Sequence, residues 1–373
     1  MDALMLPLNW QRVRLGDIGK PCMCKRVMKH QTTRYGEIPF YKIGTFGNTA
    51  DAFISKKLFL EYKTKYSFPK KGDILISASG TIGRAVIYDG KPAYFQDSNI
   101  VWIDNDETLV KNDFLFYAYS NVKWNTEHTT ILRLYNDNFR NTLIPLPPLN
   151  EQSAIANILS ALDRYLCALN SLILKKEGVK KALNFELLSQ RKRLKGFNQA
   201  WQRVRLGDIA NYLTSNLSVE QITQQGKIKV YDVNNFIGYT DTTFISDKPY
   251  ISIVKDGSVG RVRILPPKTN ILSTMGALIA NHRTTTEFLF YLLSNFDFKN
   301  FTSGSIIPHI YFKDYKEKTI FLPPLNEQIA IANILSALDN EITSLKNKKR
   351  QFENIKKALN HDLMSAKIRV LEK

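Results

Sequence analysis

Two stretches of this sequence occur twice. Residues 10–18, with the sequence WQRVRLGDI, return unchanged as residues 201–209. The heptapeptide LPPLNEQ at residues 146–152 likewise returns at residues 322–328. An internal repeat constrains the fold more than any other feature, because each copy has to form one structural unit. The chain therefore contains two copies of one structural unit, and its function has to explain why two copies are needed.

The spacing between the copies shows which part of the unit has a fixed length. Trp10 and Trp201 are 191 residues apart, whereas Asn150 and Asn326 are 176 residues apart. The region between the two motifs is therefore 15 residues longer in the first copy. The same 176-residue offset persists through the segment that follows Asn150 and Asn326. Each copy thus has a variable part followed by a part of constant length.

The constant part predicts a long helix. The two prolines before it block an earlier helix, and Asn150 or Asn326 is predicted as its N-cap. Glu151 or Glu327 then places a carboxylate in the first turn, where the helix dipole favours a negative charge.

Apolar residues follow along this helix in alternating steps of four and three. This 3.5-residue period is typical of a coiled-coil seam. Because each seam needs a partner, we expect the two helices to pack together as an antiparallel coiled coil, with a globular domain at each end. The seam residues are Ile155, Leu159, Leu162, Leu166, Leu169 and Ile173 in the first copy and Ile331, Leu335, Leu338, Ile342 and Leu345 in the second.

The variable part reads as mixed α and β structure. Residues 71–78 and 250–254 predict strands that lead into glycine loops at residues 80–84 and 257–261. The sequence thus predicts an α+β protein: two mixed α/β globular domains in tandem, separated by two long helices and related by internal pseudo-twofold symmetry. The expected boundaries are 1–146 for the first globular domain, 147–196 for the first helix and linker, 197–322 for the second globular domain and 323–373 for the second helix.

The charge of the chain favours a polyanionic partner. It has 52 Lys and Arg against 34 Asp and Glu, a formal net charge of +18. Nucleic acid and an anionic membrane are the two candidates. No apolar run approaches the ~18–20 residues of a membrane-spanning helix, so nucleic acid is expected and a membrane is not. The N-terminus does not resemble a secretory signal, and three cysteines fit the reducing cytoplasm.

The repeated motifs together resemble a known family. An Arg-Leu-Gly-Asp near the start of a domain, a central Gly-Ser/Thr-x-Gly-Arg and a Leu-Pro-Pro-Leu-Asn-Glu-Gln that opens a long helix all occur twice. This combination, over essentially the whole chain, resembles the specificity subunit of type I restriction–modification enzymes. The resemblance implies that each globular domain is a target-recognition domain for one half of a bipartite, asymmetric site in double-stranded DNA. It also implies that the helices set the spacer between the halves.

The resemblance further implies a subunit without catalysis. Two modification subunits would methylate adenine, and ATP-dependent restriction subunits would cleave; the sequence leaves open whether a restriction subunit is present. No cofactor is expected on this chain, and S-adenosylmethionine, ATP and Mg²⁺ are expected on the partner subunits. The residues expected to contact the modification subunits are Pro147, Pro148, Asn150, Glu151, Gln152, Pro323, Pro324, Asn326, Glu327 and Gln328.

The glycine loops supply the first candidate DNA contacts. Arg84 and Arg261 follow these loops, and glycine lets a ligand approach the backbone closely. Phosphate contact is favoured over base reading, because most protein–DNA hydrogen bonds go to the DNA backbone. The alternative is that the glycines only shape a turn and each arginine is a surface charge. With two further candidates from the segments before the helices, the predicted DNA-binding residues are Thr81, Arg84, Arg133, Ser258, Arg261 and Lys313.

Catalytic and metal motifs are weak or missing in the sequence. None of the Gly-Lys pairs is followed by Ser or Thr, so there is no P-loop. Cys22 and Cys24 with His30 lack a second Cys/His pair at zinc-binding spacing, so no metal is expected. The basic run at residues 190–195 fits either DNA phosphates or a solvated linker. Two other functions stay open: a self-contained DNA-modifying enzyme that uses Glu61 or the glycine loops, and a coiled-coil adaptor that binds proteins instead of DNA.

Overall fold

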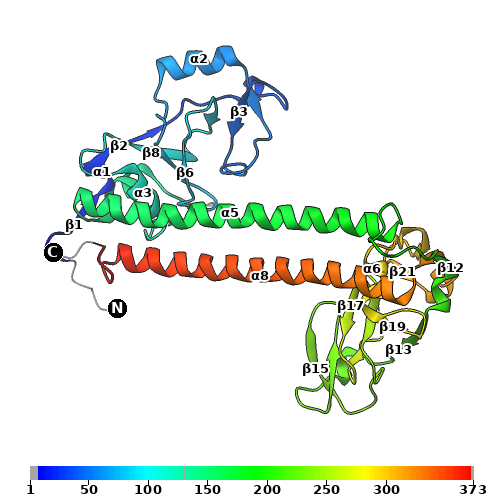
Figure 1. Ribbon diagram of the computed structural model, residues 1–373. Coiled ribbons are helices and arrows are strands. Elements are labelled where there is room, and N and C mark those ends of the chain that lie inside the picture. The colour runs from blue at the N-terminus through cyan, green and yellow to red at the C-terminus, as the bar shows by residue number, and fades with distance from the viewer. Residues whose placement is uncertain (1–6, 129–131, 371–373) are drawn as a thin grey trace. The chain divides into compact units, whose positions relative to one another are not determined.

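The computed structural model describes residues 7–128 and 132–370 of the chain (Figure 1). The chain forms two compact units. The first combines Met1–Leu169 with Lys348–Lys373, and the second is Asn170–Asn347. Each unit therefore contains one globular domain, the first half of the long helix that follows it and the second half of the other long helix.

Two sheets form the globular domain of the first unit. The larger is antiparallel in the order β2-β8-β5-β6, and the smaller is mixed in the order β4-β3-β7. Two short pairs, β1 with β11 and β9 with β10, complete the domain. The strands are β1 (Gln11–Arg14), β2 (Gly19–Met23), β3 (Ile38–Tyr41), β4 (Phe53–Ile54), β5 (Ile74–Ser77), β6 (Ala85–Ile87), β7 (Tyr94–Phe95), β8 (Ile100–Asn105), β9 (Glu127–His128), β10 (Leu132–Arg133) and β11 (Leu143–Leu146).

Helices α1, α3 and α4 contact the larger sheet, whereas Phe59 of α2 is buried in a separate core with Tyr94 of the smaller sheet. The strand β5 is buried along its whole length, as expected for an apolar run, and Phe114 of helix α3 is fully buried in the same core. Ser55 caps helix α2 by accepting a hydrogen bond from the Leu58 backbone N–H. The helices are α1 (Leu15–Ile18), α2 (Lys56–Lys65), α3 (Asn112–Tyr119) and α4 (Asn136–Asn141).

The globular domain of the second unit repeats this topology although most of its sequence differs. Its sheets have the orders β13-β19-β16-β17 and β15-β14-β18, and β12 pairs with β22 and β20 with β21. Helix α2, ten residues long, has no counterpart among the described residues and contributes most of the extra length of the first copy. The elements are β12 (Gln202–Arg205), β13 (Ala210–Thr214), β14 (Ile228–Tyr231), β15 (Phe236–Thr240), β16 (Tyr250–Val254), β17 (Val262–Leu265), β18 (Asn270–Ile271), β19 (Met275–Ala280), α6 (Thr286–Ser294), β20 (Thr302–Ser303), β21 (His309–Ile310), α7 (Phe312–Tyr315) and β22 (Thr319–Leu322).

Helices α5 (Leu149–Leu188) and α8 (Leu325–Met364) each have 40 residues. In the first unit Asp163 of α5 forms an ion pair with Lys356 of α8, and the rings of Tyr165 and Phe352 lie 4.8 Å apart. In the second unit Lys180 pairs with Asp339, and Lys176 pairs with Glu341 at 2.8 Å. In both units the residue numbers rise along one helix and fall along the other. The predicted antiparallel pairing is therefore confirmed within each unit.

The predicted seam matches the burial pattern in part. Seven of its members are buried, and the other four, Leu162, Leu166, Leu338 and Leu345, are half-buried. None of the described helices combines the length and apolarity needed to span a bilayer. The buried seam residues are Ile155, Leu159, Leu169, Ile173, Ile331, Leu335 and Ile342.

The predicted N-cap lies two residues too far along the chain. Both long helices begin at the leucine before the asparagine, and the carbonyl of Pro148 accepts the first hydrogen bond, from Gln152 N at 2.9 Å. Pro324 accepts the equivalent bond from Gln328 N at 3.0 Å. The proline therefore serves as the cap, because its carbonyl remains an acceptor although it has no N–H. The two asparagines lie inside the first turn.

Candidate functional site

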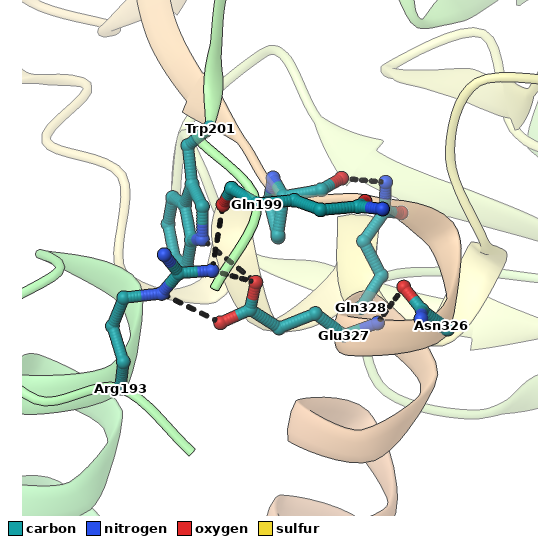
Figure 2. Close-up of polar contacts among 7 residues, drawn as sticks. Arg193, Gln199, Trp201, Asn326, Glu327 and Gln328 are labelled. Atoms are coloured by element: carbon teal, nitrogen blue, oxygen red, sulfur yellow. Dashed lines mark hydrogen bonds and ion pairs between the residues drawn. The ribbon is translucent and has the colours of Figure 1, made fainter. Parts of the chain in front are cut away.

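A buried carboxylate joins the two repeated motifs at the start of each long helix. In the second unit the Glu327 side chain is fully buried, and Trp201 Nε1 donates to its Oε2 at 3.0 Å (Figure 2). Arg193 donates to both carboxylate oxygens, from Nε at 3.1 Å and from Nη2 at 2.6 Å. The same Nη2 donates to the carbonyl of Gln199 at 2.8 Å, and the nearby carboxylate raises the pKa of Arg193. The repeated tryptophan and the repeated glutamate therefore meet in one cluster.

The first unit contains the same cluster with its own residues. Trp10 Nε1 donates to Glu151 Oε2 at 3.1 Å, and Arg369 donates to both oxygens at 2.7 and 2.9 Å. The Arg369 guanidinium also lies over the Trp10 ring, 6.0 Å from its centroid. Arg193 and Arg369 are 176 residues apart, the same offset that separates the two glutamates. In both units the arginine comes from the repeat that does not supply the glutamate.

The glutamine that follows each glutamate holds the helix start against the globular domain. Gln328 Nε2 donates to the carbonyls of Pro323 at 2.8 Å and Arg283 at 2.9 Å, and its Oε1 accepts from the Thr285 N–H at 3.1 Å. Gln152 makes the equivalent contacts in the first unit. Because these bonds lie in the interior, they fix how the helix leaves the domain.

These contacts bear on the predicted docking residues. The structure buries Pro147, Glu151 and Gln152 of the first copy and their counterparts Pro323, Glu327 and Gln328 of the second. The acid and amide groups bond within the unit, so docking through them would require the cluster to open. Asn150 and Asn326 are exposed, and the second proline of each pair is half-buried. Contact of this segment with a partner stays a prediction, and the exposed members are the ones that can make it.

The glycine loops follow the central strand of each larger sheet and have a backbone that only glycine adopts easily. Gly80 and Gly83 have φ angles of +65° and +82°, and Gly257 and Gly260 have φ angles of +82° and +80°. A Cβ at Gly83 would lie 2.0 Å from Nε1 of Trp124. The glycines therefore shape the turn, and the side chains between and after them are what the loop presents.

The predicted DNA contacts of the first unit lie on one edge of its domain. Thr81 and Arg84 are exposed, and Arg133 is exposed on the strand that forms a bridge with Ser79 at the start of the loop. Leu134 N donates to the carbonyl of Ala78 at 2.9 Å, which holds this strand against the loop. The structure thus brings these three predicted residues to the same edge.

The second unit differs from the sequence prediction at this edge. Ser258 and Arg261 are exposed, and Arg261 Nη2 donates to Asn234 Oδ1 at 2.8 Å. The counterpart of Arg133 is His309, which forms a bridge with Asp256 and contacts its Oδ1 through Nδ1 at 2.6 Å. His309, which the sequence analysis did not single out, therefore occupies the position that Arg133 has in the first unit. The 176-residue offset, which also separates Arg133 from His309, was the signal that could have identified this histidine.

Lys313 remains an exposed candidate, but on a different element. It lies in α7, and its Nζ sits 5.5 Å from the centroid of the Tyr311 ring. Within the basic run at residues 190–195, Arg193 belongs to the buried cluster, whereas Arg191, Lys192 and Lys195 are exposed.

Cys24 and Glu61, two residues considered for metal or enzyme chemistry, are both described by the structure. Residues 7–128 and 132–370 contain no group of three His, Cys, Asp or Glu residues placed to hold a metal ion. Burial raises the pKa of Cys24 to about 12, so its thiol stays protonated at neutral pH. Glu61 lies on the exposed face of α2 and pairs with Lys65 at 3.1 Å.

Comparisons with known proteins agree on one family. The model of the type I restriction modification DNA specificity domain matches residues 7–177 and again residues 198–354. A type I restriction enzyme specificity subunit from Haemophilus influenzae is 60% identical over 161 residues, which is 43% of this chain and 41% of that protein. That alignment spans less than half of either protein. The MjaVIII specificity subunit from Methanocaldococcus jannaschii is 26% identical over 99% of this chain and 95% of its own length.

Solved structures show the same fold. The S subunit of a type I restriction–modification system from M. genitalium superposes with a TM-score of 0.65 at 20% identity, over 96% of this chain and 98% of that one. A structure described as the basis of complex assembly in a type I system matches with a TM-score of 0.55 at 16% identity, over the same shares of the two chains.

Proposed function

Because the chain belongs to the family of type I restriction–modification DNA specificity subunits, we propose that it reads a bipartite, asymmetric site in double-stranded DNA for a type I restriction–modification complex. The observation that carries this proposal is the contrast between the two globular domains. They share strand topology and the position of the glycine loop. At the same edge, one presents Thr81, Arg84 and Arg133 and the other presents Ser258, Arg261 and His309. Two domains with the same strand topology but different exposed side chains suit two different half-sites.

The charge of the chain supports DNA as the ligand. Its net charge of +18 supplies the phosphate contacts on which most protein–DNA affinity depends. Arg84 and Arg261 stand beside loops that let a phosphate approach the backbone, and we assign them to phosphates rather than to bases. His309 and Arg133 lie one strand further along the edge and are the candidates for base contacts.

We assign no chemical step to this chain. In the proposed complex, two modification subunits methylate adenine with S-adenosylmethionine, and restriction subunits that use ATP and Mg²⁺ cleave the DNA. The chain then contributes the choice of site and the spacing of its halves.

The exposed surface at the start of each long helix supports two identical protein partners. Residues 149–163 and 325–339 are identical except at Ser153 and Ile329. Burial explains identity only for the inward-facing residues. Ile158 and Ile334 are nevertheless 37% and 36% exposed, and Leu149 and Leu325 are 41% and 45% exposed. An apolar surface repeated in this way fits one protein that binds twice, and we propose that these two faces dock the two modification subunits.

Light scattering on the purified complex tests this docking. Ile158→Asp should remove one modification subunit, and the Ile158→Asp, Ile334→Asp double variant should remove both. Leu172→Asp is the matched control, because Leu172 is also apolar and 39% exposed but its counterpart in the other copy is Lys348. Unchanged stoichiometry in the double variant would remove these faces from the interface.

Exchange of one globular domain tests DNA recognition itself. We expect that replacing residues 19–145 with the corresponding segment of a relative changes half of the methylated sequence and leaves the other half and the assembly intact. Methylome sequencing of cells that carry the parent or the chimaera reads this out. A chimaera that alters its protein partners and leaves the methylated sequence unchanged would support a protein adaptor instead.

A further inference from the structure

A basic cleft in the first unit lies between the glycine loop and the end of helix α8. The cleft has a volume of about 660 Å³. Its walls come from residues 83–85 at the end of the glycine loop, from α3 and from the last turns of α8. Three of its lining side chains, Arg84, Lys356 and Lys357, are cationic, and His361 lies beside them. The single carboxylate in the lining, Glu353, is 3.8 Å from Lys349.

The two lysines of the cleft have different roles. Lys356 forms an ion pair with Asp163, and its Nζ lies 5.6 Å from the centroid of the Tyr117 ring. Its presence is therefore explained by contacts inside the unit. Lys357 is exposed at the mouth of the cleft, and no hydrogen bond or ion pair within the described residues engages its ammonium group.

The second repeat keeps this arrangement. The run Lys-Lys-Ala-Leu-Asn occurs at residues 180–184 and again at residues 356–360. Lys180 pairs with Asp339 and lies over Tyr291, as Lys356 does with its own partners. Lys181 is exposed like Lys357, and the second glycine loop is likewise followed by an arginine. Stability of the unit does not account for an exposed lysine that recurs in both copies.

One buried polar side chain contributes to the lining of the cleft. Asn360 is buried, and its Nδ2 donates to Ser120 Oγ at 2.6 Å, while its Oδ1 has no partner among the described residues. The Oδ1 of the equivalent Asn184 is unpartnered in the same sense. Because Asn360 Oδ1 only accepts hydrogen bonds, it does not bind an anion directly, and the cationic side chains of the cleft are the groups that can hold one.

We propose that Lys357 and Lys181 bind backbone phosphates of the DNA. Each half-site then contacts the globular domain of one repeat and the C-terminal end of the long helix of the other repeat. The inference rests on the proposed function, and it extends the DNA surface from the glycine loop onto the long helix. These lysines add affinity without reading sequence, because phosphate contacts carry no base information.

Salt-dependent binding to a duplex of fixed, arbitrary sequence tests the inference. The full chain is used with its modification subunits, and the variants are Lys181→Gln and Lys357→Gln, singly and together. Each lost phosphate contact should reduce the slope of log K against log salt by about 0.9 and weaken binding about fivefold near 0.15 M salt. Lys175→Gln is the control, because Lys175 is exposed on the same helix and its counterpart in the other copy is already Gln351.

The outcomes separate this inference from the proposed function. A slope reduced by about 1.8 in the double variant, with Lys175→Gln unchanged and Lys→Arg variants near wild type, supports the phosphate contacts. A double variant whose slope equals that of wild type overturns the inference while DNA recognition stands. Equal losses from the Lys→Arg variants would also overturn it, because a retained charge should retain the contact. A wild-type complex that binds neither this duplex nor any other DNA would remove the proposed function itself.

Discussion

The ion pair between Glu151 and Arg369 allows a stability prediction that is confined to one unit. The Glu151 side chain is 3% exposed and that of Arg369 is 25% exposed, and both carboxylate oxygens accept hydrogen bonds from the guanidinium. Removal of one partner from a buried pair costs about 3–5 kcal/mol, because the other charge is left without compensation. Trp10 keeps its hydrogen bond, and the emptied side has access to solvent. We therefore expect Arg369→Met to destabilise the first unit by about 3 kcal/mol, the lower end of that range.

A loss of this size is measurable by thermal unfolding. For a unit of this length, 1 kcal/mol shifts Tm by about 2–4 °C, so the first unit should melt about 6–12 °C lower. Hydrogen exchange by mass spectrometry assigns the loss, because peptides from residues 149–169 should lose protection while those from residues 325–347 should not.

A second substitution gives the sharper control. The Glu151→Gln, Arg369→Met double variant should be more stable than Arg369→Met alone, because a buried amide needs no counter-charge. An Arg369→Met variant that melts at the same temperature as wild type would refute this account of the cluster. So would a double variant whose loss of stability equals the sum of the losses of the two single variants.

Three further predictions follow from other features of the two units. Gly80→Ala should cost about 1 kcal/mol of stability in thermal unfolding, whereas Gly83→Ala should cost about 3 kcal/mol because its Cβ would also overlap Trp124; equal losses would contradict the packing argument. Burial raises the pKa of Tyr88 and of Tyr250 to about 12, whereas tyrosine in the unfolded chain ionises near pH ~10. The contribution of these tyrosines to the free energy of unfolding should therefore be fully present below pH ~10 and should fall as the pH rises towards 12. Melting temperatures that do not change across this interval would argue against the burial. Insertion of one helical turn into both α5 and α8 should lengthen the tolerated gap between half-sites without changing either half-site, and a fixed gap in methylome data would show that the helices do not set the spacing.

The parts of the fold that depend on local pattern could be predicted from the sequence. The 3.5-residue period identified two helices of equal length, and it marked Ile155, Leu159 and Ile331 as buried. Repetition of the proline motif located both helix starts to within two residues. The error at Asn150 arose because asparagine is the commoner cap, whereas here the carbonyl of Pro148 accepts the first bond.

The parts of the fold that depend on contacts between residues distant in the sequence could not be predicted from local pattern. Glu151 was assigned to the helix dipole and to docking, yet its partners Trp10 and Arg369 lie 141 and 218 residues away. The repeat itself held the missing information. Arg193 and Arg369 are separated by the same offset as the two glutamates, so a search for equivalent charges at that offset would have suggested the pairing.

The crossed composition of the units has a consequence for synthesis on the ribosome. The second unit is one continuous stretch of chain, but the first lacks its final helical segment until residues 348–370 have been translated. At about 5–20 residues per second, Asp163 and Glu151 wait about 10–40 s for Lys356 and Arg369 to emerge. The first unit is thus begun first and completed last. A nascent chain that stalls late in synthesis should therefore expose the first unit to proteolysis and leave the second unit intact.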